Sequence, residues 1–331
     1  MIVLAGDIGG KTSRLALLRD NEIFFEKAYP SSDNASLDAV AEKFLHDVRK
    51  ALGPDTHPRR ACFGVPGPVE NNTCRVTNLP WFVDAKKIEA KTKIDKVALV
   101  NDFQAAALGV TVIGQDSLHP IGGGERNPTG PIVVMGAGTG LGEGFLFWSP
   151  ADNRYQVIAS EGGHVDFTPR SALETGLMTY MAGRYGRVSN ERVLSAQGLA
   201  DIFGFLTSEP SLRPLVAEET KGQMVVDDPA AVIAGQALQG KDPICVMAIN
   251  LFCSILGGLA GNLGLTFLAT GGVFIAGGIA PRIIPIMSNG VFRQAFEAKG
   301  RFQPLVAKLP CFVVTHPSVG LLGAASVASR L

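Results

Sequence analysis

Asn101 and Asp102 stand where an apolar segment gives way to a segment of helix-forming residues. Residues 97–100 read Val-Ala-Leu-Val, which is typical of a buried strand, and residues 103–108 favour a helix. A carboxylate at the carboxyl end of a buried strand, where an α/β sheet opens to ligands, can be held rigidly against a substrate and accept a proton from its hydroxyl. The alternative is that Asp102 only caps the following helix, because Asp and Asn are favoured there.

Two glycine-rich turns repeat a strand–turn–strand pattern, one in each half of the chain. The first is Gly6-Asp7-Ile8-Gly9-Gly10-Lys11-Thr12-Ser13, and the second is Gly136-Ala137-Gly138-Thr139-Gly140. Glycines let backbone N–H groups approach a phosphate closely, so the pair predicts two phosphate-binding turns from an ancient duplication. A tight hairpin without a ligand explains either turn alone. Gly10-Lys11-Thr12 does not complete a P-loop, because the glycine which that motif needs five residues earlier is Ala5.

A second polar group lies in the second half of the chain. Glu161 and His164 flank two glycines between strand-like residues 155–159 and a helix that begins at a Ser171-x-x-Glu174 capping box. A loop of this kind can present hydrogen-bonding groups to several hydroxyls. The alternatives are a structural histidine and a metal site, for which no third ligand is evident in the sequence.

Composition excludes several classes of protein. Thirty basic and thirty acidic residues leave no net charge, so the electrostatic footprint of a nucleic-acid-binding protein is missing. The five cysteines form no CxxC pair, and we interpret them as reduced core thiols of a cytoplasmic protein without an export signal. No charged residue occurs between Asp242 and Arg282, but glycines interrupt this segment, which favours a buried helix of a soluble domain over a membrane span.

The order of elements predicts an α/β protein with two domains. Strand and helix patterns mix up to residue 112, and the stretch 114–130 is rich in Gly and Pro, as a domain boundary is. We therefore predict a smaller α/β domain at 1–112, completed by the C-terminal helix 318–331, and a larger α+β domain at 113–317. Loops at 66–68 and 78–81 can line a crevice beside Asp102.

Six motifs in order give the chain a resemblance to the bacterial glucokinase family, the kind without a zinc site, within the hexokinase and actin-like ATPase superfamily. They are Gly6-Asp7-Ile8-Gly9-Gly10, Asn101-Asp102-Phe103, residues 136–142, Glu161-Gly162-Gly163-His164-Val165-Asp166-Phe167, Glu191-Arg192-Val193-Leu194-Ser195 and residues 274–278. The resemblance implies a two-domain actin-like ATPase (ribonuclease H-like) fold with an active-site cleft between the domains. It also implies ATP-dependent phosphorylation of glucose at the 6-hydroxyl, feeding glycolysis, in a cytoplasmic homodimer that needs neither nucleic acid nor a membrane.

By the same resemblance, Asp102 is the general base that takes the proton of the 6-hydroxyl. The other sugar hydroxyls are bound by Asn78, Asn101, Glu161, His164 and Glu191. The cofactors are ATP and Mg²⁺, and Asp7 holds Mg²⁺ through water. The residues that contact the nucleotide are Gly6, Asp7, Ile8, Gly9, Gly10, Lys11, Gly136, Gly138, Thr139, Gly140, Gly277 and Gly278. Simple chain reversal also explains Gly277 and Gly278.

The chain departs from the family pattern at one place and leaves rival functions open. Lys11-Thr12 stand where the family usually has Thr-Asn, so Lys11 either faces the γ-phosphate or points into solvent. The rivals are a kinase for another sugar or a small acid, and a nucleotide-driven switch protein. A polyhydroxylated substrate suits the Glu161, His164 and Glu191 group better than a carboxylate does, because no basic residue accompanies it. Hexose selectivity, regulation and a donor other than ATP are not fixed by the sequence.

Overall fold

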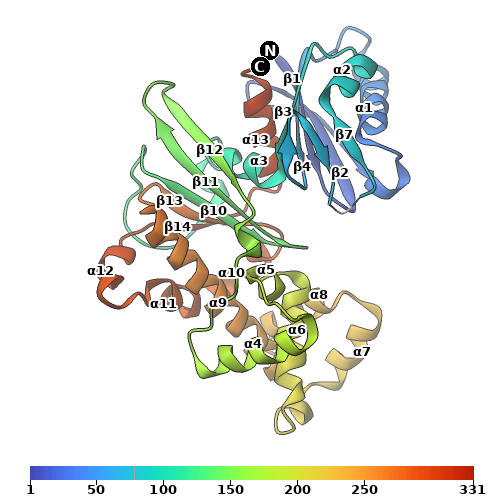
Figure 1. Cartoon of the computed structure of the whole chain (residues 1–331). Coiled ribbons are helices and arrows are strands. Elements are labelled where there is room, and N and C mark those ends of the chain that lie inside the picture. The colour runs from blue at the N-terminus through green and yellow to red at the C-terminus, as the bar shows by residue number, and fades with distance from the viewer. Residues whose placement is uncertain (78) are drawn as a thin grey trace. The chain divides into compact units, whose positions relative to one another are not determined.

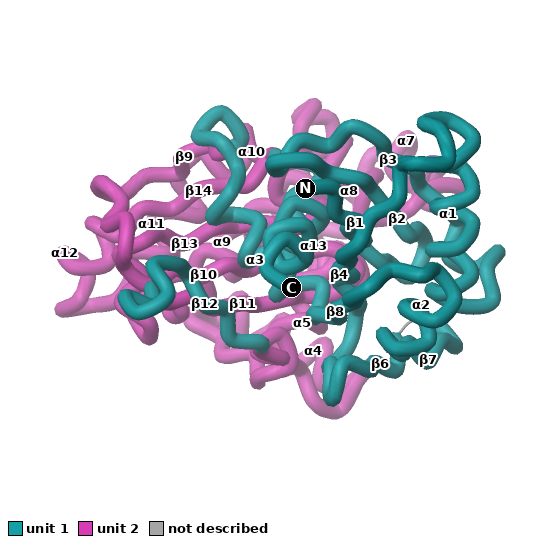
Figure 2. The backbone as a smooth tube through the Cα atoms, turned by 90° about the horizontal axis from the view of Figure 1, so that it is seen from above, with its two compact units in different colours: residues 1–117, 148–159, 316–331 teal, residues 118–147, 160–315 magenta. Residues whose placement is uncertain are grey.

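The computed structural model describes residues 1–77 and 79–331, and its chain groups into two compact units (Figures 1 and 2). Unit 1 comprises residues 1–117, 148–159 and 316–331, and unit 2 comprises 118–147 and 160–315. The predicted domains, 1–112 with 318–331 and 113–317, stay a prediction, because they concern which segments fold on their own. Asn78 lies outside the described residues.

Unit 1 is built on a five-stranded sheet in the order β3-β2-β1-β4-β8. Strands β1 and β2 form an antiparallel hairpin, whereas β1, β4 and β8 run parallel to one another. The strands are β1 Ile2–Ile8, β2 Thr12–Arg19, β3 Glu22–Pro30, β4 Arg60–Val65 and β8 Lys96–Asn101, and a three-stranded sheet adds β5 Val69–Glu70, β6 Thr73–Arg75 and β7 Phe82–Asp84. Parallel strands end at one edge, so the residues after β1, β4 and β8 are neighbours.

Helices cover both faces of this sheet, as the alternation of its side chains requires. Leu4 and Leu15 share a cluster with α1 and α2, and Val3 and Ala16 share one with α13. The helices of unit 1 are α1 Leu37–Leu52, α2 Ala85–Thr92, α3 Asp102–Gly109 and α13 Val319–Ala328. The C-terminal helix therefore packs on the sheet that the N-terminus begins (Figure 1).

Most of the second sheet, which has the order β12-β11-β10-β13-β14-β9, lies in unit 2. Strands β10, β13 and β14 are parallel, while β11 and β9 pair antiparallel with β10 and β14. The strands are β9 Leu118–Gly122, β10 Ile132–Ala137, β11 Leu141–Ser149, β12 Arg154–Ser160, β13 Gly272–Ala276 and β14 Cys311–Val314. Residues 148–159, which form the end of β11, the turn and nearly all of β12, are grouped with unit 1.

The helices of unit 2 surround α9, the long apolar helix. Asp242 caps its first turn, and Pro243 occupies the first helical position, as the Asp-Pro pair predicts. The helix is long and apolar enough to cross a membrane, but 72% of its most apolar window is buried, and it forms the core of this unit. The helices are α4 Ala172–Tyr185, α5 Asn190–Val193, α6 Ala196–Ser208, α7 Glu218–Val226, α8 Pro229–Leu238, α9 Pro243–Phe267, α10 Ile284–Met287, α11 Val291–Glu297 and α12 Gln303–Val306.

Several predicted boundaries are wrong by a few residues. Gly6 to Ile8 belong to β1 and Gly136 to β10, so both glycine turns are shorter than predicted. The sequence after Asp84 predicts a short helix through Ile88, but the helix that Asp84 caps extends to Thr92. The apolar pattern at 74–77 predicts a strand, which is observed as β6, Thr73–Arg75. The five cysteines are buried and unpaired, as predicted.

Candidate functional site

Asp7, Asn101 and Asp102 lie at the same edge of the unit 1 sheet. In the strand register, Gly64 of β4 pairs with Asp7 on one side and with Val100 on the other. Neighbouring strands are ~4.8 Å apart, so the backbones of Asp7 and Val100 are about 10 Å apart. Two carboxylates thus lie at one edge of this sheet.

Asn101, not Asp102, is the N-cap of α3. The Asn101 Oδ1 atom accepts hydrogen bonds from the backbone N–H groups of Phe103 (2.9 Å) and Gln104 (3.3 Å), and Gln104 Oε1 accepts from the Asn101 N–H at 3.0 Å. This is a complete capping box. The interpretation of Asp102 as the N-cap is therefore wrong, because Asn101 is the N-cap.

The remaining amide of Asn101 points to the loop after β4. Its Nδ2 donates to the Gly67 carbonyl at 3.3 Å, and Asn101 is only 9% exposed. An amide nitrogen carries two hydrogens, so one stays available for a substrate oxygen. Asn101 can meet a ligand only as a hydrogen-bond donor, since its oxygen caps the helix.

Asp102 begins α3 at a place where glycine permits close approach. A Cβ on Gly64 would lie 3.5 Å from the Asp102 Cα and 3.1 Å from the Ala105 Cβ. The Asp102 Oδ1 atom accepts from the Phe103 N–H at 2.9 Å. Burial, and after it the negative charge of Asp102, raise the pKa of Cys74.

Asp7 faces the first turn of α13. A Cβ on Gly320 would lie 3.2 Å from the Asp7 carboxyl carbon. Burial raises the pKa of Asp7 above its usual value, and the charge of Arg14, opposite it in β2, opposes the shift. Arg14 also donates to the Pro317 carbonyl at 3.0 Å and to Ser318 Oγ at 3.2 Å, so it ties the hairpin to the start of α13.

Two hydrogen bonds shape the first glycine turn, one within its backbone and one from Ser31. The Gly9 N–H donates to the Thr12 carbonyl at 2.9 Å, and Ser31 Oγ donates to the Gly9 carbonyl at 2.7 Å. Lys11 is exposed, and its carbonyl accepts from the Ser31 N–H. The predicted contact residues Gly9, Gly10 and Lys11 thus form a short turn, whereas Gly6 and Ile8 are buried in β1.

The second and third glycine segments meet at the ends of β10 and β13. Gly136 pairs with Ala276 in the register, and the Gly277 backbone (φ 84°) lies against Ala137, where a Cβ would overlap the Ala137 carbonyl oxygen. The Gly138 N–H donates to the Gly140 carbonyl at 2.8 Å. Thr139, Gly277 and Gly278 are exposed. The structure therefore brings together the two segments of unit 2 for which nucleotide contact is predicted.

Glu191 reaches the same hairpin from α5. Its Oε2 accepts from the Leu141 N–H at 2.9 Å, and any side chain on Gly140 would overlap this carboxylate. Its Oε1 lies 3.7 Å from His164 Nδ1. Glu161 and His164 are exposed at the two ends of a short 3-10 turn, η3 Gly162–His164, in which the His164 N–H donates to the Glu161 carbonyl. Glu161, His164 and Glu191 thus gather at the start of β11.

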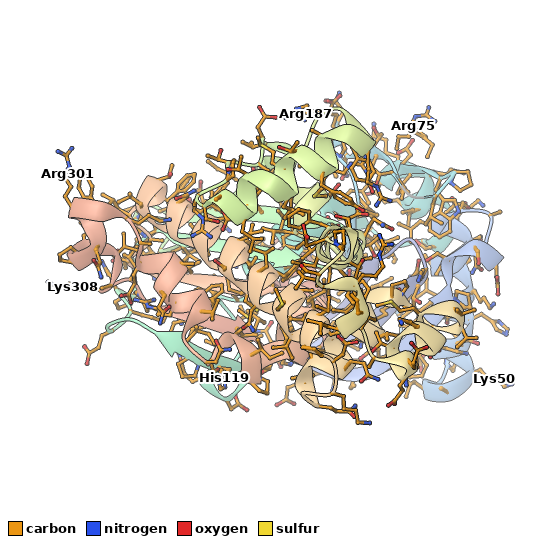
Figure 3. All side chains as sticks on the ribbon, turned by 90° about the horizontal axis from the view of Figure 1, so that it is seen from below. Lys50, Arg75, His119, Arg187, Arg301 and Lys308 are labelled. Carbon is orange, nitrogen blue, oxygen red and sulfur yellow. The ribbon has the colours of Figure 1, made fainter. Side chains whose placement is uncertain are left out.

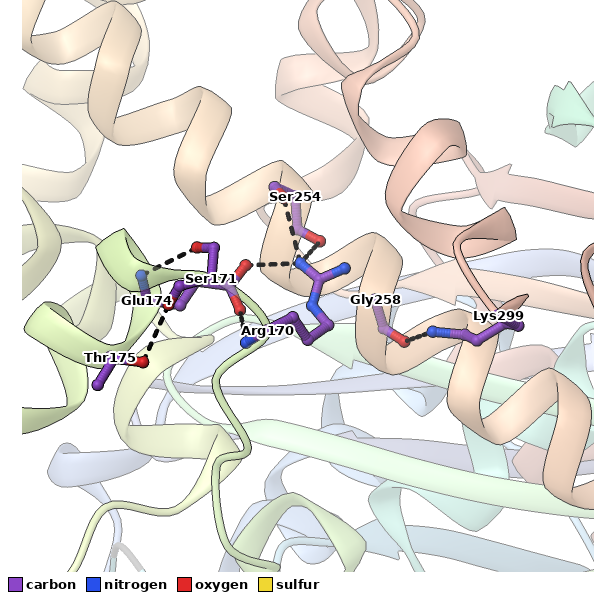
Figure 4. Close-up of polar contacts among 7 residues, drawn as sticks. All are labelled: Arg170, Ser171, Glu174, Thr175, Ser254, Gly258 and Lys299. Carbon is purple, nitrogen blue, oxygen red and sulfur yellow. Dashed lines mark hydrogen bonds and ion pairs between the residues drawn. The ribbon is translucent and has the colours of Figure 1, made fainter. Parts of the chain in front are cut away.

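The segment that leaves this turn is fastened at two points. Arg187, at the surface in Figure 3, donates to the His164 carbonyl at 2.8 Å and pairs with Asp166. Arg170 bonds both to Glu174 of α4 and to Ser254 of α9 (Figure 4). The predicted capping box is therefore half formed, because Ser171 caps α4 but the Glu174 carboxylate accepts from the Arg170 N–H.

Arg14, Ser31, Gly64 and Glu143 were not predicted as residues of these sites. Arg14 bonds to residues about 300 positions away, and no local pattern signals such a contact. A signal existed for Glu143, a charged residue within the otherwise apolar strand β11.

The described residues fit Mg²⁺ better than a metal held by protein alone. Within residues 1–77 and 79–331, no group of three His, Cys, Asp or Glu side chains is placed to hold a metal. Mg²⁺ keeps several waters and binds one or two carboxylates together with substrate phosphates. The half-buried Asp7, whose pKa is raised by burial, suits such an ion, because a cation would stabilise the ionised carboxyl.

Comparison with known proteins assigns the family. The family model described as Glucokinase matches residues 4–331. The chain belongs to the glucokinase family. It is 41% identical to the glucokinase of Nostoc sp. (strain PCC 7120) over all of this chain and 99% of that one. Glucokinase family membership agrees with the resemblance noted from the six motifs.

Solved structures give the same fold. The glucokinase of an Antarctic psychrotroph is 28% identical, with a TM-score of 0.83 over 100% of this chain and 99% of that one. A glucokinase of the ROK family from Streptomyces griseus, solved with glucose and AMPPNP, is 19% identical, with a TM-score of 0.69 over 100% and 99%. The predicted actin-like ATPase fold is confirmed.

Proposed function

We propose that this chain transfers the γ-phosphoryl group of ATP to the 6-hydroxyl of D-glucose, giving glucose 6-phosphate and ADP. The observation that carries the proposal is the edge of the unit 1 sheet. There Asn101 caps α3, so Asp102 is a carboxylate in a rigid position that the helix does not need as its cap. Full-length identity to glucokinases supports the substrates.

In this proposal Asp102 is the general base. It accepts the proton of the 6-hydroxyl as that oxygen attacks the γ-phosphorus, and a base so positioned contributes ~10²–10⁴-fold. Asn101 donates its remaining amide hydrogen to the sugar, while Glu161 and Glu191 accept from hydroxyls and His164 supplies a ring nitrogen. Asn78 is a further proposed sugar contact. A group of paired polar residues rejects sugars that lack a hydroxyl, because its members would then be left unpaired.

The glycine turns bind the nucleotide in this proposal. Backbone N–H groups at Gly10, Thr139 and Gly140 face the phosphates, while the N–H groups of Gly9 and Gly138 shape the two turns. The exposed Gly277 and Gly278 lie near the adenosine. Asp7 holds Mg²⁺ through water, and that ion, when bound, neutralises charge on the phosphates. Lys11, exposed beside the turn, adds a positive charge to the same site.

Three further points complete the proposal: the enzyme works in the cytoplasm, supplies glycolysis and forms a homodimer. Sedimentation of the purified protein measures the last point directly, and a monomer at micromolar concentration would contradict it.

The direct test is coupled ADP release with ATP, Mg²⁺ and a panel of hexoses. We expect glucose to stimulate ADP release strongly and 6-deoxyglucose to give none, because it lacks the accepting oxygen. Stimulation by another hexose but not by glucose would keep a sugar kinase and change its substrate. No stimulation by any hexose would contradict the proposal and favour a nucleotide-driven switch.

A further inference from the structure

Glu143 is a buried carboxyl group in the middle of an apolar strand. It lies between Leu141 and Phe145, and alternate residues of a strand share a face, so all three point to the same side of β11. Leu141 and Phe145 belong to the hydrophobic core of unit 2. Glu143 itself is only 3% exposed. A charged residue type is rarely buried in this way unless it is paired.

No partner compensates for this burial within the described residues. The Glu143 Oε1 atom has no hydrogen-bond donor or acceptor there, and no cation forms an ion pair with the side chain. Loss of water raises the pKa of Glu143 to about 7. The group is therefore largely neutral in mildly acidic solution.

The carboxyl of Glu143 lies directly beneath the turn that carries Glu161 and His164. A side chain on Gly162 would overlap the Glu143 Oε2 atom, and one on Gly163 would overlap the Leu141 carbonyl. The two glycines are therefore needed because the turn packs straight onto β11. With the turn in this position, the Glu143 Oε1 atom is buried away from water.

We propose that Glu143 is a positioning residue for the sugar site: its neutral carboxyl supports the Glu161–His164 turn, and its ionisation displaces that turn. The link to sugar binding rests on the function proposed above. The reason is solvation, since an ionised carboxylate without donors gains water only when Gly162 moves away from it.

The charged and titratable groups around Glu143 do not replace it in this role. They come from the turn, from Arg170 ahead of α4, and from α4, α5 and α6: Glu161, His164, Arg170, Glu174, Tyr180, Arg184, Tyr185, Glu191, Arg192 and Asp201. Glu174 and Asp201 are paired with Arg170 and Arg184. The residues of α9 carry no charge. Comparison of the wild type with Glu143→Gln therefore isolates the titration of Glu143 from that of His164.

Linkage fixes the direction of the effect. The carboxyl has a pKa of about 7 beneath the closed turn and an ordinary one of about 4.5 when the turn is displaced. The packed position of the turn is therefore favoured at low pH. The equilibrium constant for packed over displaced turn falls by up to tenfold per pH unit between pH 4.5 and pH 7, and it falls no further above pH 7.

The test is hydrogen exchange of the amides of Gly162, His164 and Val165, measured without sugar from pH 5 to pH 8 and corrected for intrinsic exchange. These N–H groups bond within the turn and to Ser160. We expect their protection in the wild type, relative to Glu143→Gln, to fall at least tenfold between pH 5 and pH 7. Glu125→Gln, which removes an exposed carboxylate from unit 2, should follow the wild type.

A protection ratio that does not change with pH would overturn the inference. If Glu143→Gln does not fold, Glu143→Met, of similar length, takes its place with the same expectation. A second measurement is the Kd for glucose. We expect the ratio of the wild-type Kd to the Glu143→Gln Kd to rise at least threefold from pH 5 to pH 7. If protection depends on pH as expected but glucose does not bind, the role of Glu143 in the turn is supported and the proposed substrate is contradicted.

Discussion

At the scale of single residues, Asn101 and Asp102 divide two tasks between adjacent positions. The capping oxygen of Asn101 holds the start of α3, and its amide nitrogen holds the Gly67 loop. These two contacts of Asn101 fix the backbone beside it and so hold Asp102 at the edge of the sheet. The sequence predicted the pair and its strand–helix junction, but it could not decide which of the two was the cap, since both residue types are favoured there.

Substitution of Asn101 should separate stability from sugar binding. Asn101→Ala removes the cap and the Gly67 contact, so the free energy of unfolding should fall by about 1–3 kcal/mol. Asn101→Ser keeps a capping oxygen and should recover roughly 1 kcal/mol of that loss. Both lack the amide, so both should raise the KM for glucose. Urea unfolding and steady-state kinetics measure the two effects, and equal stability of the variants would contradict the capping role.

At the scale of elements, the sequence predicted what local patterns determine. The two hairpins and the helix starts at Ser171 and Asp242 are all present. Strand β9 was missed because it lies in a Gly- and Pro-rich stretch. It is the edge strand of its sheet, where Pro120 opposite Phe312 removes a donor without much cost. Packing of α13 on α3 joins distant segments, so no local pattern reveals its contacts.

Gly323 and Gly235 provide a matched pair of helical glycines that tests this packing. A Cβ on Gly323 of α13 would overlap the Ala105 carbonyl of α3, whereas one on Gly235 of α8 would meet nothing within 4 Å. Gly323→Ala should therefore lower the free energy of unfolding by about 1–3 kcal/mol. Gly235→Ala should raise it by up to roughly 1 kcal/mol through helix propensity. A stabilised Gly323→Ala would show that α13 does not pack as described.

Gly320 connects the same helix to Asp7. An added Cβ would stand 3.2 Å from the Asp7 carboxyl, so Gly320→Ala should displace that group. We expect a higher Mg²⁺ requirement and a lower kcat, with the KM for glucose little changed. Gly222→Ala, in α7 with open space around it, serves as the control. An unchanged Mg²⁺ titration would remove Asp7 from the proposed metal site.

At the scale of the whole molecule, buried ionisable groups set how stability depends on pH. The pKa of Glu143 is raised to about 7 in the folded chain, against about 4.5 when unfolded. The folded state binds this proton more tightly than the unfolded state. The contribution of Glu143 to the free energy of unfolding is therefore most favourable below pH 4.5 and decreases as the pH rises to 7. The penalty at neutral pH is roughly 3 kcal/mol.

Glu143→Gln should remove this penalty and its pH dependence. The difference in unfolding free energy between the variant and the wild type should grow in favour of the variant from pH 5 to pH 7 and then level off. Urea titrations of both proteins at each pH measure it. A difference that is constant with pH would mean that Glu143 has an ordinary pKa.

A comparison of the wild type with Asp102→Asn tests whether Asp102 takes the proton of the sugar hydroxyl. Asp102→Asn keeps the shape of the side chain and should still bind glucose, as calorimetry would show. Its glucose-dependent ADP release should fall by ~10²–10⁴-fold in kcat. Glucose binding with turnover near that of the wild type would contradict the claim, because the carboxylate at the end of β8 would then be no base.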